Sequence, residues 1–190
     1  MKSGIVGVIG AMDNEIELLK SSMNVKTTDT LAGMTYYCGM LSGYPVALVR
    51  CGIGKVNAAI CAQTLIHCFG AEQIINTGVA GSLDNEIDIG DIVVSRDAVQ
   101  HDMDVTRLGY KRGDIPGNEL SVFPADEKLR KNAMESAAGL ALERMGFEAL
   151  SASLFLLTGV CACALPSRRT AENRAAISFF IVKILRFQFN

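Results

Sequence analysis

The chain has 190 residues, a formal net charge of −2 and a hydrophobic content of 49%. This length suits one ordinary domain with a sizeable core. A near-neutral charge without a local basic cluster argues against a nucleic-acid-binding protein. The two histidines, His67 and His101, are far apart in the sequence, so we expect no zinc site.

Four apolar runs rich in β-branched residues predict strands at residues 5–9, 46–49, 73–77 and 91–95. Because these runs are continuous rather than alternating, we expect strands that are buried on both faces. A hairpin is also predicted, with residues 34–39 and 45–50 joined by L-S-G-Y.

Three helices are predicted between and after these strands, each from the spacing of its apolar residues. The first covers residues 15–23 and directs Ile16, Leu19 and Met23 inward. The second covers residues 55–69, with Val56, Ala59, Ile60 and Ile66 inward, and the third covers residues 126–145, with Leu129, Ala133, Ala137 and Leu140 inward. We therefore expect an α/β single domain with a central mixed β-sheet flanked by helices.

The last part of the chain lacks a clear period from about Gly146 onward. We therefore divide the chain into an α/β domain over residues 1–145 and an atypical tail over residues 146–190. Residues 149–167 carry no charge and are just long enough to span a membrane. Their glycine and small polar residues weaken that interpretation, and we expect no membrane association.

The cysteines lie inside apolar runs without C-x-x-C spacing, which is typical of reduced core thiols in a cytoplasmic protein. They are Cys38, Cys51, Cys61, Cys68, Cys161 and Cys163.

The loops that follow the predicted strands are the best candidates for a binding site. In an open α/β sheet, ligands gather at the carboxyl ends of the strands. These ends lead here into A-M-D-N-E, R-C-G-I-G-K, T-G-V-A-G-S and H-D-M-D-V-T. Together the loops predict a small-molecule pocket. Gly4, Gly7 and Gly10 do not have the spacing of a dinucleotide fingerprint, and we expect them to allow close helix packing.

Glu15 is the candidate catalytic residue, at the start of the first helix. An acidic side chain is favoured there by the helix dipole alone, and Asp13 or Glu17 would serve equally well as a catalytic carboxylate. The residue pattern by itself does not choose among the three.

Five motifs in register give the chain a resemblance to a known family. They are G-A-M-D-N-E-I, C-G-I-G-K-V-N-A-A, I-I-N-T-G-V-A-G-S-L, I-G-D-I-V-V-S and H-D-M-D-V-T-R-L-G-Y-K-R-G-D-I-P-G. From residue 1 to about 145 the chain resembles the 5′-methylthioadenosine/S-adenosylhomocysteine nucleosidases of the purine nucleoside phosphorylase superfamily.

The resemblance implies hydrolysis of a nucleoside, with water as co-substrate and with no metal or organic cofactor. Glu15 would be the general base that takes a proton from the attacking water. Met12 would pack on the ribose. Val79, Ala80 and Gly81 would lie near the nucleoside, although the family often has Ser at the position of Val79.

The resemblance also implies a cytoplasmic homodimer, in which a loop of one subunit closes the 5′-substituent pocket of the other. Val105, Leu108 and Pro116 match that loop, and their apolar character suits a methylthio or homocysteinyl tail.

Residues 146–190 depart from the family. They contain no S-G-D-x-F segment, no Met-Glu pair and no I-S-D acid. We interpret the tail as a frameshift product and expect a chain that is inactive or nearly so. Two alternatives stay open: a phosphorolytic relative, whose phosphate would have to bind Arg50 or Lys55, and a truncated homologue without activity.

Overall fold

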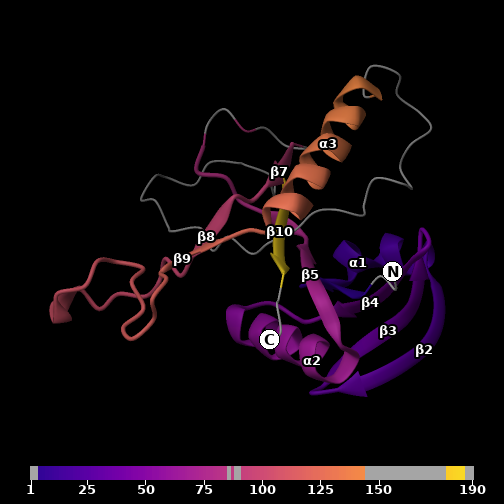
Figure 1. Ribbon diagram of the computed structural model, residues 1–190, viewed down its shortest axis with the longest axis horizontal. Coiled ribbons are helices and arrows are strands. Elements are labelled where there is room, and N and C mark those ends of the chain that lie inside the picture. The colour runs from indigo at the N-terminus through magenta and orange to yellow at the C-terminus, as the bar shows by residue number, and fades with distance from the viewer. Residues whose placement is uncertain (1–3, 85–86, 88–90, 144–178, 187–190) are drawn as a thin grey trace, which may run out of the picture.

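A computed structural model describes residues 4–84, 87, 91–143 and 179–186, and it has the expected α/β architecture (Figure 1). An eight-stranded sheet has the order β2-β3-β4-β1-β5-β10-β6, and β7 pairs with β10. The helices and strands in chain order are β1 (Ile5–Gly10), α1 (Asp13–Ser21), β2 (Asn24–Leu31), β3 (Met34–Leu41), β4 (Tyr44–Arg50), α2 (Lys55–Phe69), β5 (Ala71–Thr77), β6 (Val79–Ala80), β7 (Ile92–Val94), β8 (Asp97–Val99), the 3₁₀ turn η1 (Thr106–Leu108), β9 (Val122–Pro124), α3 (Glu127–Glu143) and β10 (Phe179–Arg186).

The four predicted strands and the hairpin are confirmed. β1 pairs in parallel with β4 and β5, and β3 pairs antiparallel with β4. The hairpin turns at Ser42 and Gly43, whose φ angles are 48° and 84°. Two consecutive residues with positive φ match the twist of antiparallel strands, and glycine adopts this conformation without strain.

β2 was not predicted from the sequence. All eight of its residues are exposed, and they read N-V-K-T-T-D-T-L. This strand lies at the edge of the sheet and pairs only with β3 within the described residues. It exists because β3 supplies hydrogen-bonding partners, so it needs no apolar pattern of its own. Lys26 and Asp29 are typical of an edge strand that avoids pairing with other chains.

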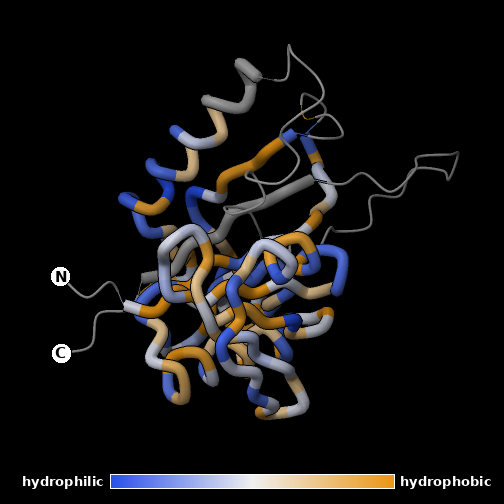
Figure 2. Tube along the Cα trace, turned by 90° about the vertical axis from the view of Figure 1, so that its right-hand side faces the viewer, coloured by the Kyte–Doolittle hydropathy of each residue, from blue (hydrophilic) through white to orange (hydrophobic). Residues whose placement is uncertain are grey.

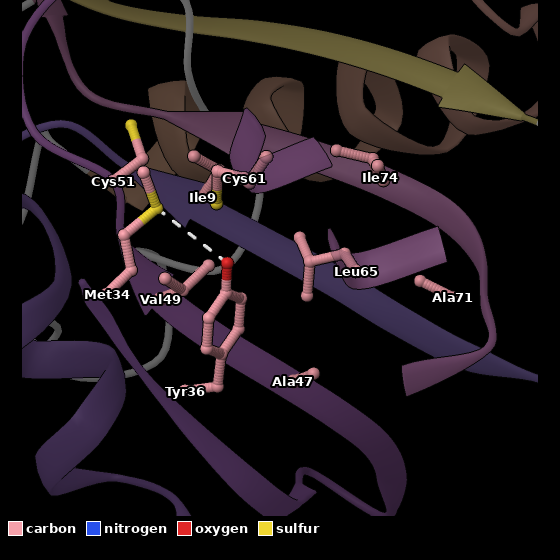
Figure 3. Close-up of a cluster of buried hydrophobic side chains, with 10 residues drawn as sticks. All are labelled: Ile9, Met34, Tyr36, Ala47, Val49, Cys51, Cys61, Leu65, Ala71 and Ile74. Atoms are coloured by element: carbon pink, nitrogen blue, oxygen red, sulfur yellow. Dashed lines mark hydrogen bonds between the residues drawn. The ribbon is translucent and has the colours of Figure 1, made fainter. Parts of the chain in front are cut away.

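Two hydrophobic clusters cover the two faces of the sheet, because neighbouring strand residues point to opposite sides. One cluster contains Val8, Leu48 and Ile75 and packs against α1 and Ala133 of α3. The other contains Ile9, Val49 and Ile74 and packs against α2 (Figure 3). Apolar segments accordingly gather inside the lower body of the molecule (Figure 2).

The inward face of α1 was predicted correctly, since Ile16, Leu19 and Met23 are buried. On α3, Ala133 is buried and Leu129 packs against the same cluster. Ala137 is half-buried, whereas the side chain of Leu140 lies outside the described residues.

The predicted inward face of α2 is wrong for three of its four residues. Val56, Ala59 and Ile60 are exposed, whereas Ile66 packs against the core as predicted. The buried residues of this helix are Cys61 and Leu65. Neither face of α2 is clearly polar, so the sequence pattern does not determine which side packs. Gly7 of β1 decides it, because a Cβ there would lie 2.9 Å from Leu65 Cδ1. The missing side chain lets α2 approach the sheet, as we expected for Gly7, whereas the space at Gly4 is filled by the Glu72 side chain of β5.

Four of the six cysteines are described, and all four are free. Cys51 and Cys61 are buried, as predicted. Cys38 is half-buried and Cys68 is exposed, so a core position is wrong for Cys68. Its position on α2 explains this, because that face of the helix points away from the sheet.

Part of the tail belongs to the sheet. β10 runs antiparallel to β5 and parallel to β7, between β5 and β6. The sheet thus includes a C-terminal strand that residue patterning did not predict. No helix among the described residues is long and apolar enough to span a membrane, and residues 149–167 lie outside the described part.

Candidate active site

The ends of three parallel strands lie side by side and define the candidate site. Gly10 at the end of β1 aligns with Arg50 at the end of β4 and with Thr77 at the end of β5. Three of the four loops predicted to line a pocket therefore begin at the same edge of the sheet. The Cys51 N–H donates to the Gly10 carbonyl at 2.8 Å, which holds the first two loops together.

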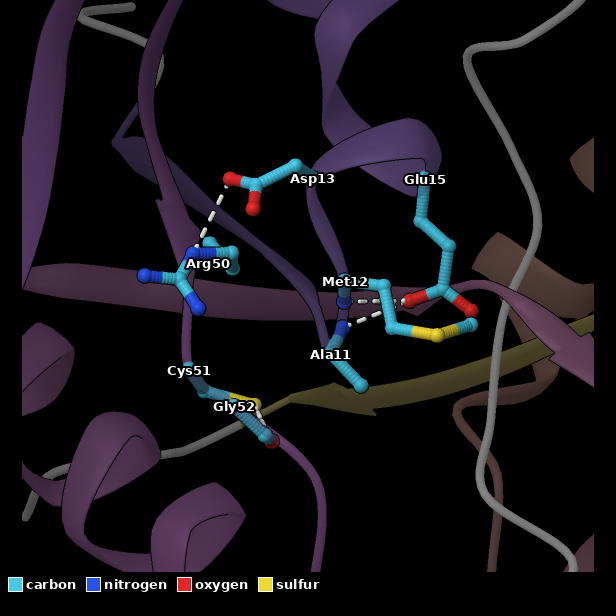
Figure 4. A network of polar contacts seen from close by, with 7 residues as sticks. All are labelled: Ala11, Met12, Asp13, Glu15, Arg50, Cys51 and Gly52. Carbon is cyan, nitrogen blue, oxygen red and sulfur yellow. Dashed lines mark hydrogen bonds and ion pairs between the residues drawn. The ribbon is translucent and has the colours of Figure 1, made fainter.

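Glu15 is the buried acid at this edge, with an exposed fraction of 8%. Its Oε2 accepts hydrogen bonds from the backbone N–H groups of Ala11 at 2.7 Å and Met12 at 2.9 Å (Figure 4). Its Oε1 accepts the N–H of Val79 at 2.8 Å. The carboxylate thus joins the loop after β1 to the loop after β5.

The carboxylate position also depends on a glycine that residue patterning did not single out. A Cβ at Gly78 would collide with Oε1, and it would lie 2.6 Å from Cδ of Glu15. A side chain at position 78 would therefore displace the acid. The signal in the sequence was T-G-V-A-G-S, where the first glycine stands directly after the strand.

Burial sets Glu15 apart from the two other candidate acids. Glu17 is exposed, and Asp13 has an exposed side-chain fraction of 84% and an ion pair with Arg50 at 3.0 Å. Burial and three backbone donors distinguish Glu15 from both. A fixed, partly desolvated carboxylate is the type of group that serves as a general base.

Chemically, the carboxylate still has acceptor capacity. An ionised carboxylate offers about four lone-pair sites, and the three N–H donors occupy three of them. One site on Oε1 remains for a water molecule, which the acid could orient and deprotonate. The backbone donors also stabilise the negative charge of the base before it accepts a proton.

The predicted substrate-binding residues lie beside the acid. Met12 precedes the first turn of α1 and is half-buried. Val79 is half-buried, Ala80 is buried and Gly81 is exposed, so this segment runs outward from the acid. The structure brings these four residues to one place, and their roles toward a nucleoside stay predictions.

Cys51 is a further group at this edge that the sequence placed only in the core. Its Sγ donates to the Gly52 carbonyl at 3.0 Å. A hydrogen bond with Cys61 lowers the pKa of the Cys51 thiol, while the same contact and burial raise the pKa of Cys61. The two thiols connect the site to the core beneath α2.

Val105, Leu108 and Pro116 lie elsewhere in the same chain. They belong to the segment between β8 and β9, which extends away from the body of the molecule (Figure 1). Leu108 is 73% exposed, Pro116 is exposed and Val105 is half-buried. Within one chain these residues are therefore not part of the Glu15 site.

Among the described residues, no group of three or more His, Cys, Asp or Glu side chains is placed to hold a metal ion. The polar groups of the site are instead one carboxylate and the backbone amides that face it.

Known proteins resemble this chain both in sequence and in fold. The sequence profile of the phosphorylase superfamily matches residues 5–180. A 5′-methylthioadenosine/S-adenosylhomocysteine nucleosidase from Anoxybacillus flavithermus is 41% identical over 133 residues, covering 70% of this chain and 57% of the relative. One from Lysinibacillus sphaericus is 40% identical over 141 residues, covering 74% and 61%.

Solved structures agree with the sequence matches. A nucleosidase of this kind from Neisseria meningitidis, in complex with methylthio-immucillin-A, is 39% identical with a TM-score of 0.68, covering 74% of this chain and 59% of that one. A Colwellia psychrerythraea nucleosidase in complex with adenine is 35% identical with a TM-score of 0.69, covering 74% and 57%. The chain spans about three fifths of the length of these relatives. With the profile matching nearly all described residues, the chain belongs to the phosphorylase superfamily, and within it the match is to the 5′-methylthioadenosine/S-adenosylhomocysteine nucleosidases.

Proposed function

We propose that the Glu15 site is built to hydrolyse the N-glycosidic bond of 5′-methylthioadenosine and S-adenosylhomocysteine, with release of adenine. The observation that carries the proposal is the buried Glu15 carboxylate, held by N–H groups from two loops. The similar nucleosidases from Neisseria meningitidis and Colwellia psychrerythraea bind methylthio-immucillin-A and adenine, respectively. Such ligands suit a pocket at the ends of the strands.

In the proposed step, Glu15 takes a proton from a water molecule, and the water oxygen forms a bond to the anomeric carbon of the ribose. The C–N bond to adenine breaks, and its electron pair leaves with the base. The adenine must then gain a proton. A positioned acid or base contributes about 10²–10⁴-fold to such a rate.

In this chain we expect the site to be impaired. Residues 146–190 contain no I-S-D acid to protonate the leaving adenine and no Met-Glu pair to hold the ribose hydroxyls. Because no acid protonates the leaving adenine, its departure becomes the difficult part of the reaction, even with Glu15 as general base. We therefore propose that the chain is inactive or nearly so, and that residues 146–190 arose from a frameshift near residue 146.

Phosphorolysis is the second candidate reaction, and two ion pairs weigh against it. It requires a basic group that is available for phosphate beside the loops. Arg50 pairs with Asp13 at 3.0 Å, and Lys55 pairs with Asp102 at 2.5 Å. Each cation that stands beside the loops thus already has a carboxylate partner.

We also propose a cytoplasmic homodimer. Ile53, Val56 and Ile60 have exposed fractions of 72%, 67% and 44%, and Val56 and Ile60 lie one turn apart on α2. A continuous apolar face of this kind is typical of a protein–protein interface. In the dimer, Val105, Leu108 and Pro116 of one subunit would close the 5′-substituent pocket of the other.

The test measures adenine release from both nucleosides by the purified chain and by Glu15→Gln, with and without phosphate. Equal and negligible release by the two proteins supports an impaired enzyme. Release by the wild type that Glu15→Gln abolishes supports the nucleosidase and overturns the impairment. Release that requires phosphate overturns hydrolysis in favour of phosphorolysis.

Sequencing the coding DNA from codon 140 onward in all three frames tests the frameshift. A frame that resumes with S-G-D-x-F, a Met-Glu pair and I-S-D would supply the partner acid, and the protein translated from it should release adenine. If no frame contains these motifs, the frameshift proposal is wrong and the nucleosidase activity is to be abandoned for this chain.

A further inference from the structure

Residues 97–124, from β8 to β9, form a segment that lies outside the Glu15 site and extends from the rest of the molecule (Figure 1). We call it the arm. Its two strands pair from Asp97 with Pro124 to Val99 with Val122, and they form a two-stranded sheet separate from the main one. Such a ribbon is marginally stable in water on its own. The direction in which the arm points must therefore be fixed by contacts at its base.

The arm itself is internally well bonded. The Gly113 N–H donates to the Met103 carbonyl at 2.8 Å, and Asp104 accepts from the Thr106 hydroxyl at 2.7 Å and its N–H at 3.2 Å. Asp114 Oδ2 accepts the Lys111 N–H at 2.9 Å. These bonds hold the turns of the arm together.

Among the described residues, a side-chain contact between segments far apart in the sequence ties the arm to the body. Lys55 Nζ lies 2.5 Å from Asp102 Oδ2, forming an ion pair between the first residue of α2 and the base of the arm. The hydrogen bond from Lys55 lowers the pKa of the Asp102 carboxyl. A lysine in the first turn is unfavourable for the helix dipole. Its presence there, with no acidic residue in that turn, is explained by the pair and not by the stability of α2.

Lys55 is also connected to the Glu15 site through the short loop between β4 and α2. It follows Gly52 and Gly54, whose φ angles of 83° and 106° turn the chain sharply from β4 into α2. Cys51, just before this turn, is bonded to Gly10 of β1. The ion pair thus relates the direction of the arm to the edge of the sheet where Glu15 lies.

We propose that Lys55 and Asp102 are positioning residues: their ion pair anchors the arm to α2 and so places Val105, Leu108 and Pro116 for closure of the neighbouring subunit's pocket. The anchor stands on the geometry of this chain, whereas the closure rests on the proposed function. Neither residue touches the substrate in this proposal.

Limited proteolysis with chymotrypsin, at a protein concentration where the chain is a monomer, tests the anchor, because in the single chain Leu108 and Tyr110 have exposed fractions of 73% and 44%. Exposed ion pairs are weak, so we expect cleavage after these residues to be about two- to fivefold faster in Asp102→Asn and in Lys55→Gln. The charge reversal Lys55→Asp/Asp102→Lys should restore slow cleavage. Lys131→Gln, which removes an exposed pair with Glu135 on α3, is the matched control and should cleave as the wild type does.

Equal cleavage of the wild type, Asp102→Asn and Lys55→Gln overturns the anchor, and so does a charge reversal that cleaves as fast as the single variants. The affinity of the protein for 5′-methylthioadenosine tests whether the ion pair places Val105, Leu108 and Pro116 for closure of the pocket. Binding that is severalfold weaker in Asp102→Asn than in Lys131→Gln supports it, and equal affinity overturns it. If the wild type binds no nucleoside, the proposed function and the placement both fail, while the proteolysis still decides the anchor.

Discussion

Gly78 and Glu15 fit together sterically, because the Glu15 carboxylate occupies the space that a side chain at position 78 would fill. The next residue, Val79, donates its N–H to the same carboxylate at 2.8 Å. The loop after β5 therefore both makes room for the acid and binds it. This relationship predicts a specific coupling between the two positions.

Gly78→Ala should lower the free energy of unfolding by about 1–3 kcal/mol, the usual cost of overpacking a buried position. The added methyl group must displace the Glu15 carboxylate and weaken its bonds to the backbone. Urea denaturation measures the change. In a Glu15→Ala background the same substitution should cost much less, because the side chain that it collides with is gone. An equal cost in both backgrounds would show that the collision does not involve Glu15.

Glu15→Gln should also destabilise the fold. A glutamine presents one acceptor oxygen and one NH₂ group, so at least one N–H among those of Ala11, Met12 and Val79 loses its partner. An unsatisfied buried donor costs about 1–3 kcal/mol. Thermal or urea denaturation is the measurement.

The control for this prediction is Glu17→Gln, an exposed acid on the same helix. It should change stability by no more than about 0.5 kcal/mol. If Glu15→Gln is as stable as Glu17→Gln, the three backbone bonds do not hold the acid as the structure describes.

The buried side chain of Tyr36 should make the free energy of unfolding decrease at alkaline pH. Burial raises the pKa of its hydroxyl from 10.0 to about 12, and the side chain stacks on Phe69 with ring centroids 4.7 Å apart. The unfolded chain therefore loses this proton at a lower pH than the folded chain does. Stability from this group is fully present below pH 10.0 and decreases as the pH rises to about 12.

Tyr36→Phe removes the titrating group and should flatten this part of the curve of unfolding free energy against pH. Tyr44→Phe, at a tyrosine that is 61% exposed, is the control and should leave the curve unchanged. An identical alkaline decline in wild type and Tyr36→Phe would assign the loss of stability to other groups.

A charge placed on the exposed apolar face of α2 should weaken the proposed homodimer. Val56→Glu should raise the dissociation constant of the proposed homodimer at least about tenfold, because an unpaired charge in an interface costs more than about 1.4 kcal/mol. Sedimentation velocity over a range of concentrations measures it, with Ser136→Glu on the exposed part of α3 as control. A wild type that sediments as a monomer at every concentration would contradict the dimer itself.

Much of the fold followed from residue patterning, for an identifiable reason. Strands buried on both faces, such as β1 and β4, need continuous apolar runs, and the hairpin needs a turn that tolerates positive φ at Ser42 and Gly43. β2 gave no such signal, because an exposed edge strand depends on its neighbour and not on its own composition. The inward face of α2 was wrong because the contact of Leu65 with the space above Gly7 joins residues distant in the sequence.

The sequence by itself determined which chemistry was available: three acids at the start of α1, glycine-rich loops after the strands, and five motifs that identify the family. It left Asp13, Glu15 and Glu17 as equivalent acids. The tertiary structure decided among them, because only the parallel pairing of β1, β4 and β5 brings the Val79 N–H and the side-chain-free Gly78 to the Glu15 carboxylate. Contacts of this kind depend on which strands become neighbours in the sheet, and the residue pattern of one strand does not determine its neighbours.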